Sequence, residues 1–118
     1  RTQNDIEMDG FGVWSFINSV APKQVDRLLK RNNVTKADID QYIFHQASLM
    51  TLESIMRLMK LNKEQVFINI HNIGNTVSAS IPIALKNAID QDKVNNGSTV
   101  ILSGFGVGLS YGAILMKI

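Results

Sequence analysis

His45 and Asn75 are the two side chains whose positions in this sequence best suit chemistry on a substrate. His45 follows the apolar run 42–44, which we predict to be a buried strand, and Asn75 lies in a polar turn, 71–76, before a predicted helix. Ligands of open α/β sheets bind at the carboxyl ends of the strands, so these two side chains can converge on one carbonyl oxygen. Neutral donors at such a place stabilise negative charge that develops on the oxygen. Structural roles remain open for both, because His45 can be a satisfied histidine at a strand end and Asn75 can cap the helix.

Other motifs indicate less chemistry. His71 has no cysteine and no HxH or HExxH spacing around it, so it fits a turn better than a metal site. The glycine-rich run 104–108 leads into a predicted strand and not a helix, which does not fit a dinucleotide-binding loop. Glycines there suit the close approach of a backbone amide to a substrate. The methionines of segment 48–60 fit the filling of a core, and Trp14 can belong to a core or line a ligand channel.

The elements that must position these residues follow from apolar periodicity and turn residues. The predicted elements are helices 11–32, 48–60 and 77–90, and strands 42–44, 66–70, 99–103 and 109–118. Thr35, with Asp38 three residues later, predicts a capped turn between the first helix and the first strand. The last two strands are joined by a short loop and should pair antiparallel. This alternation predicts an α/β fold with a layered mixed sheet and helices on both faces.

Composition fits one domain over residues 1–118, with 45% hydrophobic and 19% charged residues to build a core and a surface. A formal net charge of +2 is too small to indicate a nucleic-acid surface. We expect no membrane attachment, since no apolar run reaches the roughly 20 residues that a membrane-spanning helix needs. No signal peptide is visible, so the expected compartment is the cytoplasm. The first residue is Arg1 and not Met, which predicts an excised segment of a longer chain.

Several motifs together resemble the β-ketoacyl-ACP synthase III family, where ACP is acyl carrier protein. The motifs are Phe44-His45-Gln46-Ala47, then Gly74-Asn75-Thr76 with Ser80 and Pro82 behind it, the glycine-rich ending from Gly104 to Gly112, and the lead-in Met8-Asp9-Gly10 with Trp14. Asn75 follows His45 by thirty residues, and the resemblance covers residues 8–118. Each motif alone is weak, whereas their combination at this spacing is specific.

The resemblance implies a thiolase-like fold of two similar α/β halves, of which this chain would be the C-terminal half. In that family a cysteine from the N-terminal half accepts an acyl group from acyl-CoA. A histidine and an asparagine then hold the thioester carbonyl of malonyl-ACP and stabilise the enolate that forms when carbon dioxide leaves. His45 and Asn75 would be this pair, and the backbone N–H of Val107 would help form the oxyanion hole. The residues implied to bind substrate or pantetheine are Met8, Gly10, Trp14, Ala47, Ser48 and Phe105.

The resemblance also implies the partners: acyl-CoA, acyl carrier protein, the missing N-terminal half and a second copy in a homodimer. It implies no cofactor and no metal, because the acyl groups arrive on coenzyme A and phosphopantetheine. The chain has no cysteine, so on its own we expect it to be inactive. Met50 stands where many family members carry an arginine that helps to dock acyl carrier protein. Two alternatives therefore stay open, a family member with a different acyl acceptor and a non-catalytic module that binds pantetheine or a partner.

Overall fold

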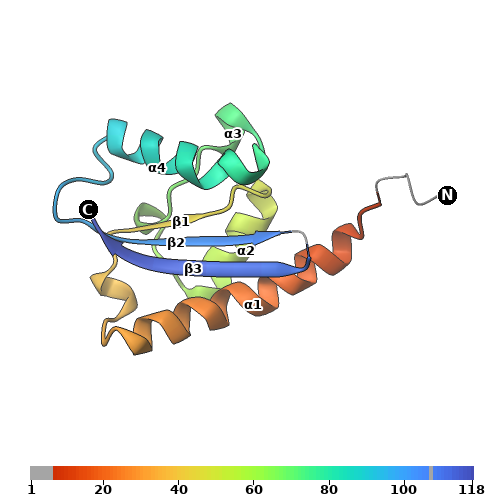
Figure 1. Cartoon of the computed structure of the whole chain (residues 1–118), viewed down its shortest axis with the longest axis horizontal. Coiled ribbons are helices and arrows are strands. Elements are labelled where there is room, and N and C mark those ends of the chain that lie inside the picture. Colours follow the sequence, from red (N-terminus) through yellow and green to blue (C-terminus); the bar gives the residue numbers. More distant parts are fainter. Residues whose placement is uncertain (1–6, 107) are drawn as a thin grey trace.

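The computed structural model describes residues 7–106 and 108–118, which form a small sheet flanked by helices (Figure 1). The helices are α1 (Gly10–Arg31), α2 (Leu49–Met59), α3 (Ile70–Ile73) and α4 (Ser80–Asp90), and the strands are β1 (Gln41–Phe44), β2 (Thr99–Gly106) and β3 (Ser110–Lys117). Short 3-10 turns occur at Lys36–Asp38, Lys63–Gln65 and Val77–Ala79. Among the helices of these described segments, none combines the length and apolar character needed to cross a membrane.

The sheet has the strand order β1-β2-β3 and mixes both kinds of pairing. β1 runs parallel to β2, with Phe44 opposite Ser103, and β2 runs antiparallel to β3, with Gly106 opposite Ser110. Parallel neighbours need a long crossover, and α2, α3 and α4 lie in the chain between β1 and β2. The predicted mixed sheet and the predicted antiparallel final pair are both confirmed.

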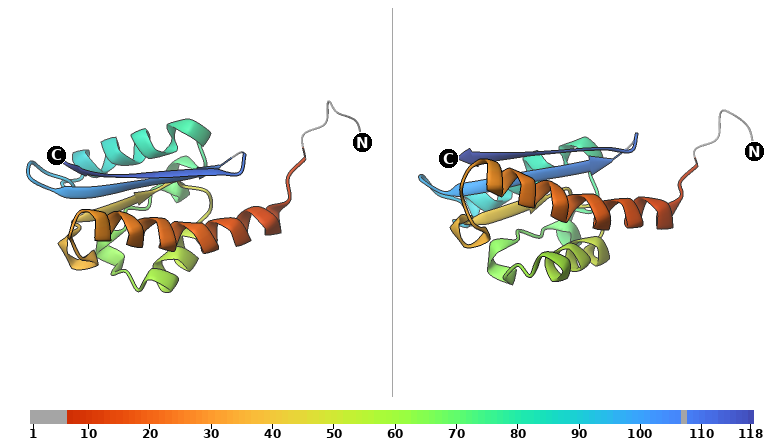
Figure 2. Two further views of the ribbon diagram at one scale, coloured as in Figure 1. Left: turned by 60° about the horizontal axis from the view of Figure 1, so that its bottom comes forward. Right: turned by 90° about the horizontal axis from the view of Figure 1, so that it is seen from below.

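Helices cover both faces of the sheet, as Figure 2 shows, with α1 and α2 on one side and α4 on the other. The burial of β1 explains this two-sided cover. All of its residues are buried, and successive side chains point to opposite faces of the sheet. Tyr42 and Phe44 join the core that includes Val25 of α1 and Leu52 of α2, while Ile43 joins the core under α4. The two-sided burial predicted from the apolar run 42–44 is confirmed.

Helix α2 begins and ends where its sequence indicates. The Ser48 hydroxyl accepts a hydrogen bond from the Thr51 backbone N–H at 3.1 Å, which satisfies one of the free donors of the first turn. Leu52, Ile55 and Met59 recur at helical spacing and are buried. Lys60 ends the helix in the left-handed conformation, with φ of 55°. The predicted helix 48–60 therefore includes both of its cap residues.

The predicted strand 66–70 is wrong beyond its first residue. Val66 makes one isolated parallel bridge to Tyr42, and the chain then turns into α3, which also replaces the first part of the predicted turn 71–76. The β-branched residues suggested a strand. In the folded chain, however, the carbonyl of Phe67 is taken by the Gln46 side chain and not by another strand. Strand propensity reflects half-buried packing, and here that packing is available without a continued ladder.

The predicted helix 77–90 is correct from residue 80 onward but begins with a 3-10 turn. Val77 has φ of +57°, a left-handed conformation that cannot continue a right-handed helix. The regular helix α4 starts three residues later, at Ser80. This irregular entry brings the Val77 backbone N–H to the side chain of Asn75, 2.9 Å from its oxygen Oδ1.

Candidate functional site

His45 lies at the carboxyl end of β1 and is held there by the last hydrogen bond toward β2. Its backbone N–H donates to the Ser103 carbonyl at 2.9 Å. The imidazole is half-buried and meets the ring of Phe105 edge-on, with centroids 5.7 Å apart and planes at 81°. This burial lowers the pKa of His45 below its ordinary value, because desolvation penalises the imidazolium. The ring is therefore neutral near pH 7, with one nitrogen that donates and one that accepts.

Asn75 follows the turn at Gly74, whose φ of +80° is readily adopted by glycine. The Asn75 side-chain oxygen Oδ1 accepts a hydrogen bond from the Val77 backbone N–H at 2.9 Å. Its amide nitrogen Nδ2 donates to the Ala47 carbonyl at 3.4 Å. With the oxygen occupied, the amide has a defined orientation and presents its N–H groups toward the His45 loop. Asn75 is exposed, so a ligand can reach it.

The hydrogen bond between Asn75 and Ala47 brings the two predicted site loops together, because Ala47 is two residues after His45. Ala47 is itself tied to His45, since its N–H donates to the His45 carbonyl at 2.9 Å. Asn75 does not cap α4, because no side chain of the described residues makes a cap hydrogen bond at the start of that helix. It closes a local turn instead, by accepting from the Val77 N–H. Two uncharged donors at adjoining loops are an arrangement suited to binding one oxygen atom.

The predicted substrate-binding residues near the N-terminus belong to the start of α1 and the residues just before it. Met8 precedes α1, Gly10 begins it, and Trp14 lies in its second turn. Figure 1 shows this end of α1 projecting past the end of the sheet at which β2 ends and β3 begins. Met8 is 79% exposed, and the Trp14 ring stacks on Phe11 with centroids 6.1 Å apart. Their role in binding stays a prediction.

The remaining predicted site residues have identifiable structural partners. Ser48 uses its hydroxyl to cap α2, and Ala47 accepts the Asn75 amide. Phe105 is 8% exposed and packs against His45, so its contact with the site is through the imidazole. The prediction for the Val107 backbone N–H lies outside the described residues.

Sequence reasoning missed the residues that hold the site together. Gln46 is 1% exposed and Ser80 is 2% exposed, the Gln46 backbone N–H donates to the Ser80 hydroxyl, and the Gln46 side chain also accepts from the Asn69 backbone N–H. The only sequence signal for Gln46 is a polar residue between an apolar strand and a helix. Both belong to the motifs that carried the family resemblance, but nothing local assigns them a role.

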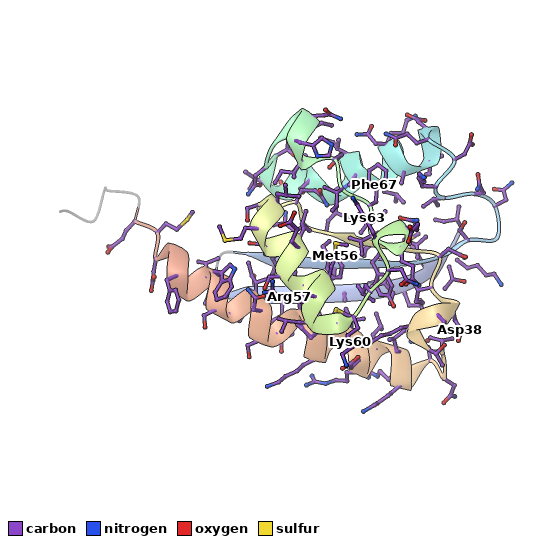
Figure 3. The ribbon with its side chains drawn as sticks, turned by 180° about the vertical axis from the view of Figure 1, so that it is seen from behind. Asp38, Met56, Arg57, Lys60, Lys63 and Phe67 are labelled. Carbon is purple, nitrogen blue, oxygen red and sulfur yellow. The ribbon has the colours of Figure 1, made fainter. Side chains whose placement is uncertain are left out.

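A separate groove of about 580 Å³ lies between α2 and the segment after it. Figure 3 labels three of its residues, Met56 on α2 together with Lys63 and Phe67. Neither His45 nor Asn75 lines this groove. It is distinct from the predicted site.

Comparison with known proteins identifies the family of the chain. Residues 29–118 match the family model described as 3-oxoacyl-[acyl-carrier-protein] synthase III C terminal. The chain belongs to this family. It is 37% identical over 114 residues to the β-ketoacyl-[acyl-carrier-protein] synthase III of Campylobacter curvus, covering 97% of this chain and 34% of that protein.

Solved structures of the same family share the fold. The synthase III of Thermus thermophilus superposes with a TM-score of 0.94 at 32% identity, covering 99% of this chain and 36% of that one. The enzyme of Pseudomonas aeruginosa gives a TM-score of 0.91 at 31% identity, covering 99% and 37% respectively. The predicted α/β, thiolase-like fold is thereby confirmed. The chain spans about a third of the length of the curated relatives it matches.

Proposed function

We propose that this chain supplies the enolate-stabilising half of a β-ketoacyl-ACP synthase III, in the condensation of an acyl group from acyl-CoA with malonyl-ACP that initiates fatty-acid synthesis. The observation that carries the proposal is the hydrogen bond from Asn75 to Ala47, which joins the Asn75 loop to the His45 loop. The relatives named above are synthases of this class. Their nucleophilic half has no counterpart in this cysteine-free chain.

In the proposed reaction, His45 and Asn75 donate hydrogen bonds to the thioester oxygen of the malonyl group. The bond between the malonyl α-carbon and its carboxylate breaks, and carbon dioxide leaves. The electron pair moves into the thioester as an enolate, whose negative oxygen the two donors stabilise. The enolate carbon then attacks the acyl group on the cysteine of the other half, and the cysteine thiolate is the leaving group.

The electrostatics of the described residues support these roles. A neutral His45 needs no proton exchange with solvent before it donates, and burial favours that form. The Asn75 amide has no ionisable proton near neutral pH, so it serves as a donor and not as an acid. Donors that are oriented before the reaction lose little free energy to reorganisation when charge develops. No bound cofactor is required, because coenzyme A and phosphopantetheine carry the groups that react.

The direct test is release of carbon dioxide from malonyl-ACP by the complete protein that contains this chain. His45→Ala and Asn75→Ala should each lower the rate by about a hundredfold or more. Asn72→Ala is the matched control, since Asn72 is an exposed asparagine in α3, three residues before Asn75. It should leave the rate unchanged. Unchanged rates in the His45 and Asn75 variants would refute the proposed roles.

A second candidate, a family member with a different acyl acceptor, is favoured by Met50. This side chain is 69% exposed on α2, at the place where a docking cation is frequent in the family. Arg57 lies two turns further along the same helix face and is exposed, so a cation for an acidic carrier is still present (Figure 3). Acyl transfer to a small alcohol without carbon dioxide release would support the second candidate. If both reactions are absent, a binding role without catalysis is favoured.

We also infer that the protein forms a homodimer and works in the cytoplasm. Apolar side chains of β3 and the preceding loop support self-association, because Leu109 is 50%, Tyr111 48% and Ile114 54% exposed. Sedimentation of the chain at high concentration tests this, and a clean monomer would contradict it.

A further inference from the structure

The side chain of Gln46, the residue directly after His45, is buried, and each of its polar atoms has a partner. Nε2 donates to the Phe44 carbonyl at 2.8 Å and to the Phe67 carbonyl at 3.3 Å. Oε1 accepts from the Asn69 backbone N–H at 3.1 Å. Only 1% of the residue is exposed. A buried amide with every donor and acceptor used has one orientation, and it fixes the groups around it.

The partners of Gln46 lie on both sides of Asn75 in the chain. Asn69 is the residue before α3 and precedes Asn75, and Ser80 follows Asn75 at the start of α4. The Gln46 backbone N–H donates to the Ser80 hydroxyl at 2.7 Å. The segment from Asn69 to Ser80, which contains Asn75, is therefore bonded at both ends to the residue directly after His45.

We infer that Gln46, with Ser80, is a positioning residue that sets the separation of His45 and Asn75 in the active site. This inference rests on the proposed function of that pair. Gln46 acts through its neighbours, since its own polar atoms are all engaged within the protein. Residues that position reacting groups affect rate strongly, because a displacement of about 1 Å can cost about a hundredfold.

The decisive variant is Gln46→Met, which keeps the length of the side chain but removes its hydrogen bonds. Gln65→Met is the matched control. The Gln65 amide also donates to two backbone carbonyls, of Lys36 and Ile39, each at 3.0 Å, and accepts one backbone N–H, from Asn62 at 3.3 Å. Those partners lie at the opposite end of β1 from His45. The control therefore removes the same set of bonds without touching the site loops.

We expect Gln46→Met to lower kcat for carbon dioxide release from malonyl-ACP by about ten- to a hundredfold in the complete protein, with little change in KM. Gln65→Met should change kcat by less than about threefold. Equal kcat for the two variants would overturn the inference. If His45→Ala also leaves kcat unchanged, the proposed function fails; if His45→Ala is inactive and Gln46→Met is not impaired, only the positioning role fails.

A second variant guards against failure of Gln46→Met to fold. Ser80→Ala removes the acceptor of the Gln46 N–H with little change in volume, and should lower kcat by about three- to tenfold in the same assay. Ser54→Ala is its control, a buried serine whose hydroxyl bonds to Asn18 between α1 and α2. An unimpaired Ser80→Ala, or an equal effect of both serine variants, would overturn the inference.

The positioning role also has a readout in this chain without catalysis. The Asn75 side-chain amide should give a pair of NMR signals displaced from those of a free amide, because it bonds to Val77 and Ala47. Gln46→Met should move these signals toward the positions of an amide without hydrogen bonds, while Gln65→Met leaves them in place. Unshifted Asn75 signals in a folded Gln46→Met chain would contradict the inference whatever the activity.

Discussion

The backbone of Val77 is strained, and a single substitution should reveal it. Val77 has φ of +57°, yet its side chain is 73% exposed and so contributes little packing. For residues other than glycine, the left-handed conformation costs about 1–2 kcal/mol, and for a β-branched residue it is a marked outlier. The conformation points the Val77 N–H at the Asn75 side chain. We therefore expect the strain to be part of how the amide of Asn75 is oriented.

The free energy of this strain can be measured by comparing Val77→Gly with Val77→Ala, since both substitutions remove the same exposed methyl groups. Glycine relieves about 1–2 kcal/mol of left-handed strain that alanine retains. It also loses about 0.5–1 kcal/mol through the greater freedom of the unfolded chain. Val77→Gly should therefore be more stable than Val77→Ala by about 0.5–1 kcal/mol. At Glu53, an exposed position inside α2, the order should reverse, with glycine about 1 kcal/mol less stable than alanine.

Equilibrium urea unfolding of the four variants, followed by circular dichroism, measures these differences. We expect the glycine variant to have the higher free energy of unfolding at Val77 and the alanine variant to have the higher free energy of unfolding at Glu53. Glycine that is less stable than alanine at both positions would refute the assignment of strain to Val77. In the complete protein, Val77→Gly should also release carbon dioxide more slowly than the unchanged protein, because a relaxed loop holds Asn75 less firmly.

Further predictions concern the core, the caps and the histidine. Leu52→Ala should lower the free energy of unfolding by about 2–5 kcal/mol, measured by urea unfolding, because Leu52 is 0% exposed in the core between α1, α2 and the sheet. The Asp38 carboxylate accepts hydrogen bonds from the backbone N–H and hydroxyl of Thr35, which hold its pKa below the ordinary value. The stabilisation from the ionised Asp38 carboxylate is present above the ordinary carboxyl pKa and is lost as pH falls through the folded pKa. On acidification, the free energy of unfolding of Asp38→Asn should therefore fall less than that of the unchanged protein. Burial lowers the pKa of His45, so NMR titration should give a midpoint below 6.5. The unfolded chain then binds a proton at His45 more readily than the folded chain, so the free energy of unfolding should decline as pH falls from 6.5 to that midpoint. Lys60→Gly should raise stability by about 0.5–1 kcal/mol in thermal unfolding, because Lys60 ends α2 with φ of 55°.

Local elements of this fold could be predicted because their signals lie within a few residues. The α2 helix follows from apolar residues at helical spacing, and Ser48 at its start supplies a cap within the same turn. The capped turn from Thr35 to Asp38 was likewise predicted and is confirmed by the hydrogen bonds of Asp38. Such features depend on neighbours in the chain, so no tertiary information was needed.

The segment 66–70 shows where local patterns fail. Its β-branched residues favour a strand, but only Val66 pairs with β1. A strand continues only when a partner offers free N–H and C=O groups along its length. Here the Gln46 side chain donates to the Phe67 carbonyl and accepts from the Asn69 N–H. These contacts join residues 21 and 23 positions apart, so they leave no pattern in a short stretch of sequence.

Apart from the segment 66–70, the alternation of helices and strands could be predicted from local patterns, as could the cap of α2 and the residue types at His45 and Asn75. The meeting of the two site loops, through the bond from Asn75 to Ala47, depends on how the whole chain folds. So does the half-burial of His45 against Phe105, which favours the neutral imidazole. Propensity and capping act over one or two turns of chain, whereas the separation of residues thirty apart and the solvation of a ring depend on how the elements pack.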